Sequence, residues 1–170
     1  MWVFDATPLI YLAKVDALDL ADQHEERCLV PAPVYEEVVE AGVEAGYPDA
    51  RRIEAAIDAD TFDVVSVDET PLRSRLEGNP NLSDADSAVL ACAARRGGIA
   101  VMDETAGRTA ASVEEIPTRG TVYLVLSLVR HGVITADEAR DVIDAMVEEG
   151  WYCSTDMYAK ICSKLDSLAD

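Results

Sequence analysis

Short apolar runs alternate with longer segments of helical periodicity along the first two thirds of the chain. Four runs are typical of buried strands, and a weaker run suggests a fifth: Trp2–Phe4, Cys28–Val30, Val64–Val67 and Ile99–Met102, then Val113–Ile116. Helical spacing of apolar residues predicts helices over about residues 8–22, 33–45, 49–59 and 83–96. The polar segment 69–82 predicts a loop with a short helix. Strands that alternate with helices predict an α/β fold, with a mostly parallel sheet of four to five strands covered on both faces.

The pattern changes after Gly120, where only helical periodicity continues. Helices are predicted over about residues 120–131, 135–149 and 155–168, and Thr135 followed by Glu138 is typical of a capped helix start. We therefore divide the chain into an α/β core, residues 1–119, and a helical C-terminal extension, residues 120–170, packed on the same domain. A hairpin that binds a partner protein is an equally good interpretation of the extension.

The charge of the chain is strongly acidic. Its 170 residues suit one domain, and an apolar share of 49% is enough for a substantial core. Acids outnumber bases 33 to 14, which gives a net charge of -19. Such an excess indicates a solvated, halophile-like acidic surface, whose self-repulsion concentrated salt screens. Because no membrane-length apolar run and no secretory signal are present, we predict a cytoplasmic protein without membrane contact.

Few residues are available for nucleophilic catalysis. The four cysteines form no C-x-x-C pair and indicate reduced thiols, and the two histidines lie far apart in the chain. A Ser-His-Asp or Cys-His site therefore has little material. Any metal ion would be bound by oxygen atoms, which are the ligands of hard cations.

Acids stand at two places where a predicted strand ends. Asp5 follows the first strand, and Asp103 and Glu104 follow the strand that ends at Met102. The carboxyl ends of parallel strands form the ligand-binding edge of open α/β sheets, so these acids are expected at one edge. An acid at a strand end is also a common turn residue or helix cap, so a single one indicates little.

Two further acids lie near the apolar stripes of predicted helices. Glu37 lies beside the stripe in VYEEVVEAG, whereas Glu36 and Glu40 face solvent. Asp86 lies within the stripe of LSDADSAVLACA, three residues after Ser83, where an acid also stabilises a helix start. Because an unpaired buried charge is costly, both acids are expected to have a partner.

Four converging carboxylates repel one another and raise the pKa of at least one of them unless a cation is present. Mg²⁺ or Mn²⁺ held by carboxylates can deprotonate water and stabilise the leaving oxygen of a phosphodiester. The acids therefore predict metal-assisted hydrolysis of a phosphate ester. A phosphoryl-accepting receiver-like domain also has acids at strand ends, but it needs a lysine near a late strand end, and lysine occurs here only at 14, 160 and 164.

In their order and spacing, these segments resemble a PIN domain. The matching stretches are VFDATPLI, PAPVYEEV, DSAVLACA and IAVMDE. DETAGR followed by GTVYLVLSLVRHGVIT resembles a PIN-like subfamily with an acidic pair, a nearby arginine and a helical tail. The resemblance covers essentially the whole chain. It implies a three-layer α/β/α sandwich and a Mg²⁺- or Mn²⁺-dependent ribonuclease, and many relatives are VapC-type toxins paired with a small antitoxin.

The resemblance also implies which acids are catalytic and bind metal. The first three are Asp5, Glu37 and Asp86, and the fourth is either Asp103 or Glu104. We place Asp103 first because it comes directly after the strand, and retain Glu104 as a metal or water ligand.

The same resemblance suggests supporting residues. Thr7 matches a Ser/Thr that supports the first aspartate or contacts phosphate, and Arg108 contacts the scissile phosphate or pairs with the acidic cluster. Arg95, Arg96 and Arg119 are further phosphate candidates.

The resemblance thus implies an endoribonuclease that acts on RNA, and we expect a small antitoxin partner and a homodimer with it. The alternative is a catalytically weak PIN-like module that binds RNA or a protein partner.

Overall fold

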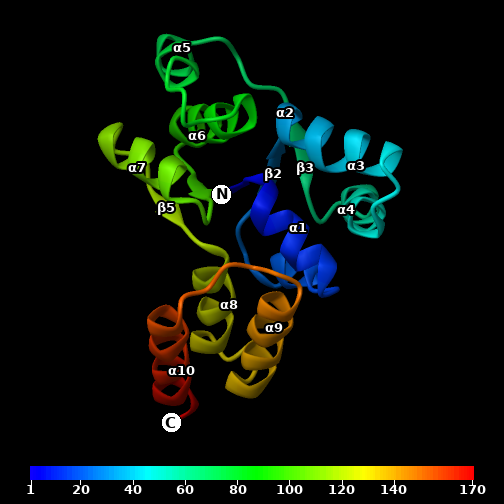
Figure 1. The fold of residues 1–170 in the computed structure, drawn as a ribbon, viewed down its shortest axis with the longest axis vertical. Coiled ribbons are helices and arrows are strands. Elements are labelled where there is room, and N and C mark those ends of the chain that lie inside the picture. Colours follow the sequence, from blue (N-terminus) through cyan, green and yellow to red (C-terminus); the bar gives the residue numbers. More distant parts are fainter.

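Five parallel strands form one central sheet in the computed structural model, which describes residues 1–170 (Figure 1). The strand order is β3-β2-β1-β4-β5. The strands are β1 (Trp2–Phe4), β2 (Cys28–Pro31), β3 (Asp63–Val65), β4 (Ile99–Val101) and β5 (Thr118–Arg119). Val3 lies opposite Leu29 of β2 on one side and Ala100 of β4 on the other, so β1 is the centre of the sheet.

Helices cover both faces of this sheet. In the first half of the chain they are α1 (Ala6–Lys14), the 3₁₀ helix η1 (Leu18–Gln23), α2 (Ala32–Tyr35), the π-helical turn η2 (Glu36–Glu40), α3 (Ala41–Glu44) and α4 (Pro48–Asp58). They continue as α5 (Pro71–Glu77), α6 (Asp84–Arg96), α7 (Thr105–Val113), α8 (Thr121–Arg130), α9 (Ala136–Glu148) and α10 (Thr155–Ala169). Figure 1 places α6 and α7 on one face and α1 and α4 on the other. The α/β/α sandwich is therefore confirmed.

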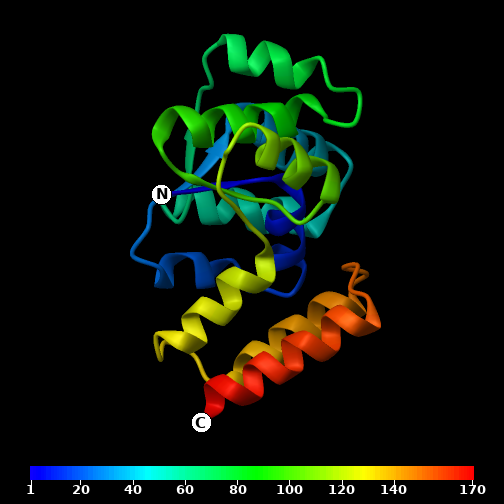
Figure 2. The same cartoon turned by 90° about the vertical axis from the view of Figure 1, so that its left-hand side faces the viewer.

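The hydrophobic core begins at the central strand and continues into the C-terminal helices. Phe4 is fully buried and packs edge-on against Phe62, with ring centroids 5.1 Å apart. The same cluster of buried side chains includes Leu124, Ile143 and Leu165 from α8, α9 and α10. Figure 2 shows these three helices together beyond one end of the sheet.

Two predicted elements were wrong in detail, and one helix was not predicted. The fifth strand is Thr118–Arg119 and not Val113–Ile116, because the chain turns at Glu115, which has a φ of 56°. The residues before that turn form α7, a helix that the apolar pattern did not predict. The first predicted helix is divided into α1 and η1 because Asp16 adopts a φ of 55°. The short helix in segment 69–82 is confirmed as α5.

None of the helices combines the length and the apolar character that crossing a membrane requires.

Candidate active site

The carboxyl edge of the sheet has its topological switch point at β1. The chain leaves β1 for β2 on one side, and β4 pairs with β1 on the other. Helices that return from this edge begin there, so α2, α6 and α7 direct their first turns toward the same place. Ligands of open α/β sheets bind at such a point. The candidate acids all come from segments that meet at this edge.

Asp5 lies at the centre of the edge, directly after β1. Its residue is only 3% exposed, and its backbone N–H donates to the carbonyl oxygen of Val101 at 3.0 Å, which fixes it beside β4. Burial, followed by the charge of Asp86, raises the pKa of the Asp5 carboxyl from 3.8 to about 8, and Glu104 and Glu37 add to this rise. A hydrogen bond from the backbone of Ala6 opposes the shift. Asp5 therefore retains its proton at neutral pH when no cation is nearby.

Glu37 lies at the rim of the site, on the π-helical turn η2. Its side chain is exposed, so the expectation that it lies on the buried side of its helix is wrong. The π turn changes the helical phase, and Val38 and Val39 are both buried in its place. Partial burial, then the charges of Asp86 and Glu104, still raise the pKa of Glu37. The carboxylate is therefore close enough to the other acids to be repelled by them.

Asp86 caps its helix and also belongs to the acidic site. Its Oδ2 accepts the backbone N–H of Ser83 at 2.8 Å, and its own N–H donates to Ser83 Oγ at 3.0 Å. Asp86 also raises the pKa of both Asp5 and Glu37, so it lies near each of them. The capping role and a place in the acidic site, both of which the sequence offered, are present in one residue.

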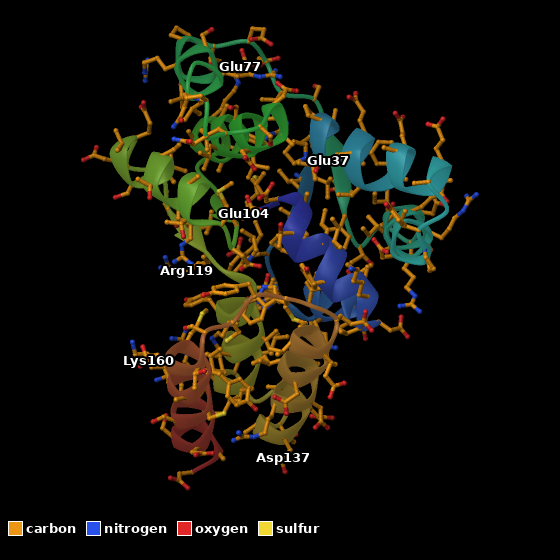
Figure 3. The ribbon with its side chains drawn as sticks, viewed as in Figure 1. Glu37, Glu77, Glu104, Arg119, Asp137 and Lys160 are labelled. Atoms are coloured by element: carbon orange, nitrogen blue, oxygen red, sulfur yellow. The ribbon has the colours of Figure 1, made fainter.

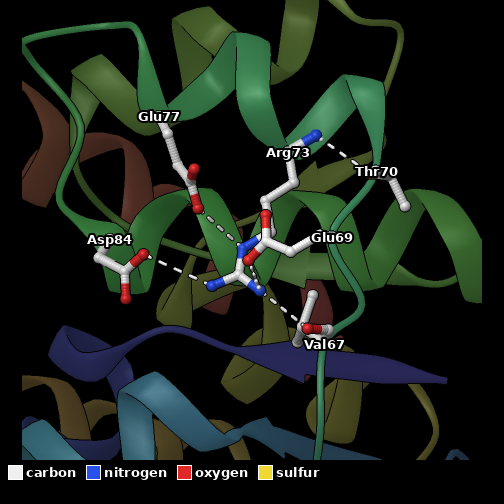
Figure 4. A network of polar contacts seen from close by, with 6 residues as sticks. All are labelled: Val67, Glu69, Thr70, Arg73, Glu77 and Asp84. Atoms are coloured by element: carbon white, nitrogen blue, oxygen red, sulfur yellow. Dashed lines mark hydrogen bonds and ion pairs between the residues drawn. The ribbon is translucent and has the colours of Figure 1, made fainter.

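A buried arginine holds the start of α6 (Figure 4). The guanidinium of Arg73 pairs with Glu69 at 3.1 Å, Glu77 at 3.0 Å and Asp84 at 3.5 Å. It also donates to the carbonyl oxygen of Val67 at 2.8 Å. Because Asp84 is the first residue of α6, this network fixes the turn that carries Asp86.

Asp103 and Glu104 are directed to different parts of the molecule. Asp103 accepts hydrogen bonds from the backbone N–H and the hydroxyl of Thr121 at 2.8 and 2.7 Å, and from Trp151 Nε1 at 3.2 Å. Its carboxylate therefore holds the start of α8 and the chain before α10. The charge of Glu104 instead raises the pKa of both Asp5 and Glu37. Of the two candidates for the fourth acid, Glu104 is the one whose charge raises the pKa of Asp5 and of Glu37, and the preference for Asp103 does not agree with this geometry.

Thr7 and Arg108 lie on either side of Glu104. Thr7 donates its hydroxyl to Glu104 Oε1 at 3.2 Å, so it supports the fourth acid rather than Asp5. Arg108 lies on α7, one turn after Glu104, and no carboxylate stands within ion-pairing distance of its guanidinium. The suggestion that Arg108 pairs with the acidic cluster is therefore wrong for this conformation.

We name Asp5, Glu37, Asp86 and Glu104 the acidic site; Figure 3 labels Glu37 and Glu104, which come from different elements. In their present positions, no group of three or more His, Cys, Asp and Glu side chains is arranged to hold a metal ion. The donor chemistry nevertheless fits a hard divalent cation, because every donor is a carboxylate oxygen. The raised pKa values of Asp5 and Glu37 arise in part from mutual repulsion, which such a cation would relieve.

The sequence did not predict the residues that hold Asp103 in place. Thr121 is fully buried and Trp151 is 5% exposed, and both donate to the same carboxylate. A buried tryptophan usually finds a partner for its ring N–H, so the position of Trp151 next to a polar turn was an available clue.

The fold and the site together define an α/β module that has an all-parallel sheet and a group of acids at its switch point. A family model for the PIN domain matches residues 1–167, and the chain belongs to this family. PIN domains are generally nucleases that use divalent metal ions, so this is a module of nuclease type. No curated protein matches the chain.

Proposed function

We propose that this protein is an endoribonuclease that hydrolyses RNA phosphodiesters with Mg²⁺ or Mn²⁺. The observation that supports the proposal is the meeting of Asp5, Glu37, Asp86 and Glu104 at the carboxyl edge of a PIN-family sheet. These four residues are the proposed metal ligands. When bound there, a divalent ion supplies an activated water and stabilises charge on the leaving oxygen.

The residues of the chain prepare the site for this chemistry. Asp5 is protonated at neutral pH without a cation, because its pKa is raised to about 8, and it must release that proton to act as a ligand. Thr7 holds one oxygen of Glu104 in position. Arg108 is the proposed contact to the scissile phosphate, since a guanidinium can bind two phosphate oxygens at once.

We propose further that the protein acts as the toxin of a toxin–antitoxin pair, with a small antitoxin partner and a homodimeric state. The proposal is supported by membership of the PIN family, in which toxins of this kind occur. The helices α8 to α10 offer surface for a second chain. Size-exclusion chromatography with light scattering, with and without a candidate antitoxin, tests both.

The decisive experiment compares wild type with Asp5→Asn in an RNA cleavage assay. The assay is run in concentrated KCl with Mn²⁺ and repeated with a chelator, because the acidic surface requires screening. We expect Mn²⁺-dependent cleavage by wild type and a loss of at least about 100-fold in Asp5→Asn, with the fold intact by circular dichroism. Asp141→Asn, on the exposed face of α9, is the matched control and should cleave normally.

Two results would reject the proposal. Equal cleavage by Asp5→Asn and wild type would show that the acidic site is not the catalytic centre. Absence of Mn²⁺ binding in calorimetry, together with absence of cleavage, would favour the alternative of a catalytically weak module that binds RNA or protein.

A further inference from the structure

A large cleft lies between α7, the end of β5 and the chain that enters α10. Its volume is about 790 Å³, within the range of pockets that hold ligands the size of a nucleotide. We name it the tail cleft and define it by Arg108, Arg119, Tyr123, Trp151, Tyr152 and Met157. It includes Asp103 and Thr105, the two neighbours of Glu104 in the chain, so it adjoins the acidic site. Figure 3 labels Arg119, the last residue of β5, and Glu104, the residue before α7.

The charge of the tail cleft is opposite to that of the whole protein. Acids outnumber bases 33 to 14 in the chain, yet the cleft contains two arginines and only one acid. That acid, Asp103, already accepts hydrogen bonds from Thr121 and Trp151. Neither Arg108 nor Arg119 forms an ion pair. The cleft therefore presents two guanidinium groups that have no carboxylate partner, which suit an anionic ligand such as a phosphodiester.

The other polar groups of the cleft lie on one face of α7. Thr105, Thr109 and Ser112 line the cleft together with Arg108, and their spacing places all four on the same side of the helix. Hydroxyl groups at this spacing can donate to phosphate oxygens or to sugar hydroxyls. This face of α7 thus provides neutral donors beside a positive charge.

Aromatic rings form the opposite wall. Tyr152 is 85% exposed and Tyr123 is 38% exposed, which is unusual for rings of this size in a folded protein. Arg119 stacks over the ring of Tyr123, with 4.8 Å from its guanidinium carbon to the ring centroid, and its Nη1 donates to the carbonyl oxygen of Thr118 at 2.7 Å. The guanidinium is therefore held in one orientation, and Tyr152 remains available for stacking.

We propose that the tail cleft binds unpaired nucleotides of the RNA next to the bond that is cleaved, with Tyr152 stacking on a base and Arg119 contacting a phosphate. Exposed aromatic rings combined with free arginines bind single strands, because every base has a face on which a ring can stack. In a duplex the bases are stacked on one another and do not reach such a wall. The inference is therefore the place of binding, the tail cleft, and the two side chains that would hold the strand there. This inference depends on the proposed function for the identity of its ligand.

The test measures binding separately from cleavage. A labelled, unstructured oligouridylate is titrated with the full chain in chelator, and fluorescence anisotropy gives the Kd at several KCl concentrations. Loss of one stacked base raises the Kd by about tenfold, so we expect this result for Tyr152→Ala at all salt concentrations. Tyr152→Phe keeps the ring and should bind as wild type does.

Arg119→Ala should have a different signature. Removing one phosphate contact from a single strand reduces the slope of log Kd against log[KCl] by about 0.7, whereas Tyr152→Ala leaves the slope unchanged. Two matched variants away from the cleft, Tyr47→Ala and Arg51→Ala, should change neither the Kd nor the slope. Annealing the oligonucleotide to its complement should weaken binding to wild type.

The outcomes separate this inference from the proposed function. Failure of wild type to bind the oligonucleotide, or unchanged binding in both Tyr152→Ala and Arg119→Ala, would overturn the tail cleft as an RNA site and leave another ligand, such as a peptide of a partner protein, to occupy it. If wild type cleaves RNA while both variants keep its KM, the cleft fails and the nuclease stands. If wild type binds through the cleft but never cleaves with Mn²⁺, the cleft stands and the nuclease fails.

Discussion

Two groups of carboxylates lie on neighbouring parts of this fold, one around Arg73 and one around Asp5. In the first, Glu69, Glu77 and Asp84 surround a guanidinium that is 11% exposed. In the second, the charges of the acidic site raise the pKa of Asp5 and Glu37, and neither lysine nor arginine forms an ion pair with any of its acids. The chain supplies the counter-charge in one place and omits it in the other.

The difference distinguishes acids that are paired within the fold from acids that have no positively charged partner. Carboxylates around Arg73 are paired when the chain folds, and they fix α5 against the start of α6. At the acidic site, burial and then repulsion by Asp86 instead raise the pKa of Asp5 to about 8, which costs stability at neutral pH. Strongly shifted carboxyls in a crevice are candidate functional groups, and this shift is the reason why we propose a cation site here.

The largest effect is expected from removing the carboxylate of each of the two adjacent acids, Asp103 and Glu104, in turn. Glu104→Gln removes a proposed metal ligand from an exposed position, so Mn²⁺-dependent RNA cleavage should fall about 100-fold with no loss of stability. Asp103→Asn turns an amide NH₂ toward a donor in Thr121 or Trp151, so the free energy of unfolding should fall by about 1–2 kcal/mol. Cleavage by Asp103→Asn should fall by much less than cleavage by Glu104→Gln.

Cleavage rates and urea unfolding of the two variants provide the measurement. A lost activity in Asp103→Asn at unchanged stability, with normal cleavage by Glu104→Gln, would return the catalytic role to Asp103.

A smaller effect, on stability alone, is expected at the other group of acids. Arg73→Met leaves Glu69, Glu77 and Asp84 without their cation. Breaking a buried ion pair costs 3–5 kcal/mol, but Glu69 and Asp84 are 71% and 66% exposed, so we expect about 2 kcal/mol in urea unfolding. The control Arg51→Met breaks the exposed pair with Glu54 and should cost no more than about 0.5 kcal/mol. Equal costs in the two variants would mean that Arg73 does not organise its region.

The smallest effect is a gain in stability at the acidic site. The pKa of Asp5 is 3.8 in the unfolded chain and about 8 in the folded one, so the folded state binds the proton more tightly. Its contribution is fully favourable below pH 3.8 and is lost as the pH rises toward about 8. Asp5→Asn removes this loss and, in chelator at neutral pH, should be more stable than wild type by at least about 1.4 kcal/mol, the equivalent of one pKa unit.

Unfolding of both proteins at pH about 5 and about 8 checks the sign, because the gain must grow with pH. Mn²⁺ should stabilise wild type more than the variant. A variant that is less stable than wild type at the higher pH would contradict the proposed state of Asp5.

The sequence was sufficient for the sheet and for most of the acids, because both leave a periodic or positional pattern. Asp5 and Asp86 follow from a strand end and a helix stripe, and each reaches the acidic site. Counting at 100° per residue failed at Glu37, because the π turn changes the helical phase. The spacing of apolar residues in one sequence does not predict where a helix contains a π turn.

The choice between Asp103 and Glu104 depends on distant partners. Thr121 and Trp151 stand 18 and 48 residues beyond Asp103, and only the folded chain brings them to it. The Arg73 network and the tail cleft are of the same kind, since each combines residues from several elements. Local patterns predicted the elements, and long-range contacts decided which side chain of a neighbouring pair performs which role.

Asp103 and Glu104 also determine how this chain tolerates change in length. They are consecutive residues that lie between β4 and α7, and one bonds to Thr121 while the other accepts from Thr7. Losing or gaining one residue between Val101 and Thr105 would move each carboxylate to the place of the other or to solvent. A substitution here removes a single function, whereas a frame-preserving deletion removes the anchor of the C-terminal helices and the fourth acid together. A one-residue deletion in this short segment is therefore expected to do more damage than a substitution of either carboxylate.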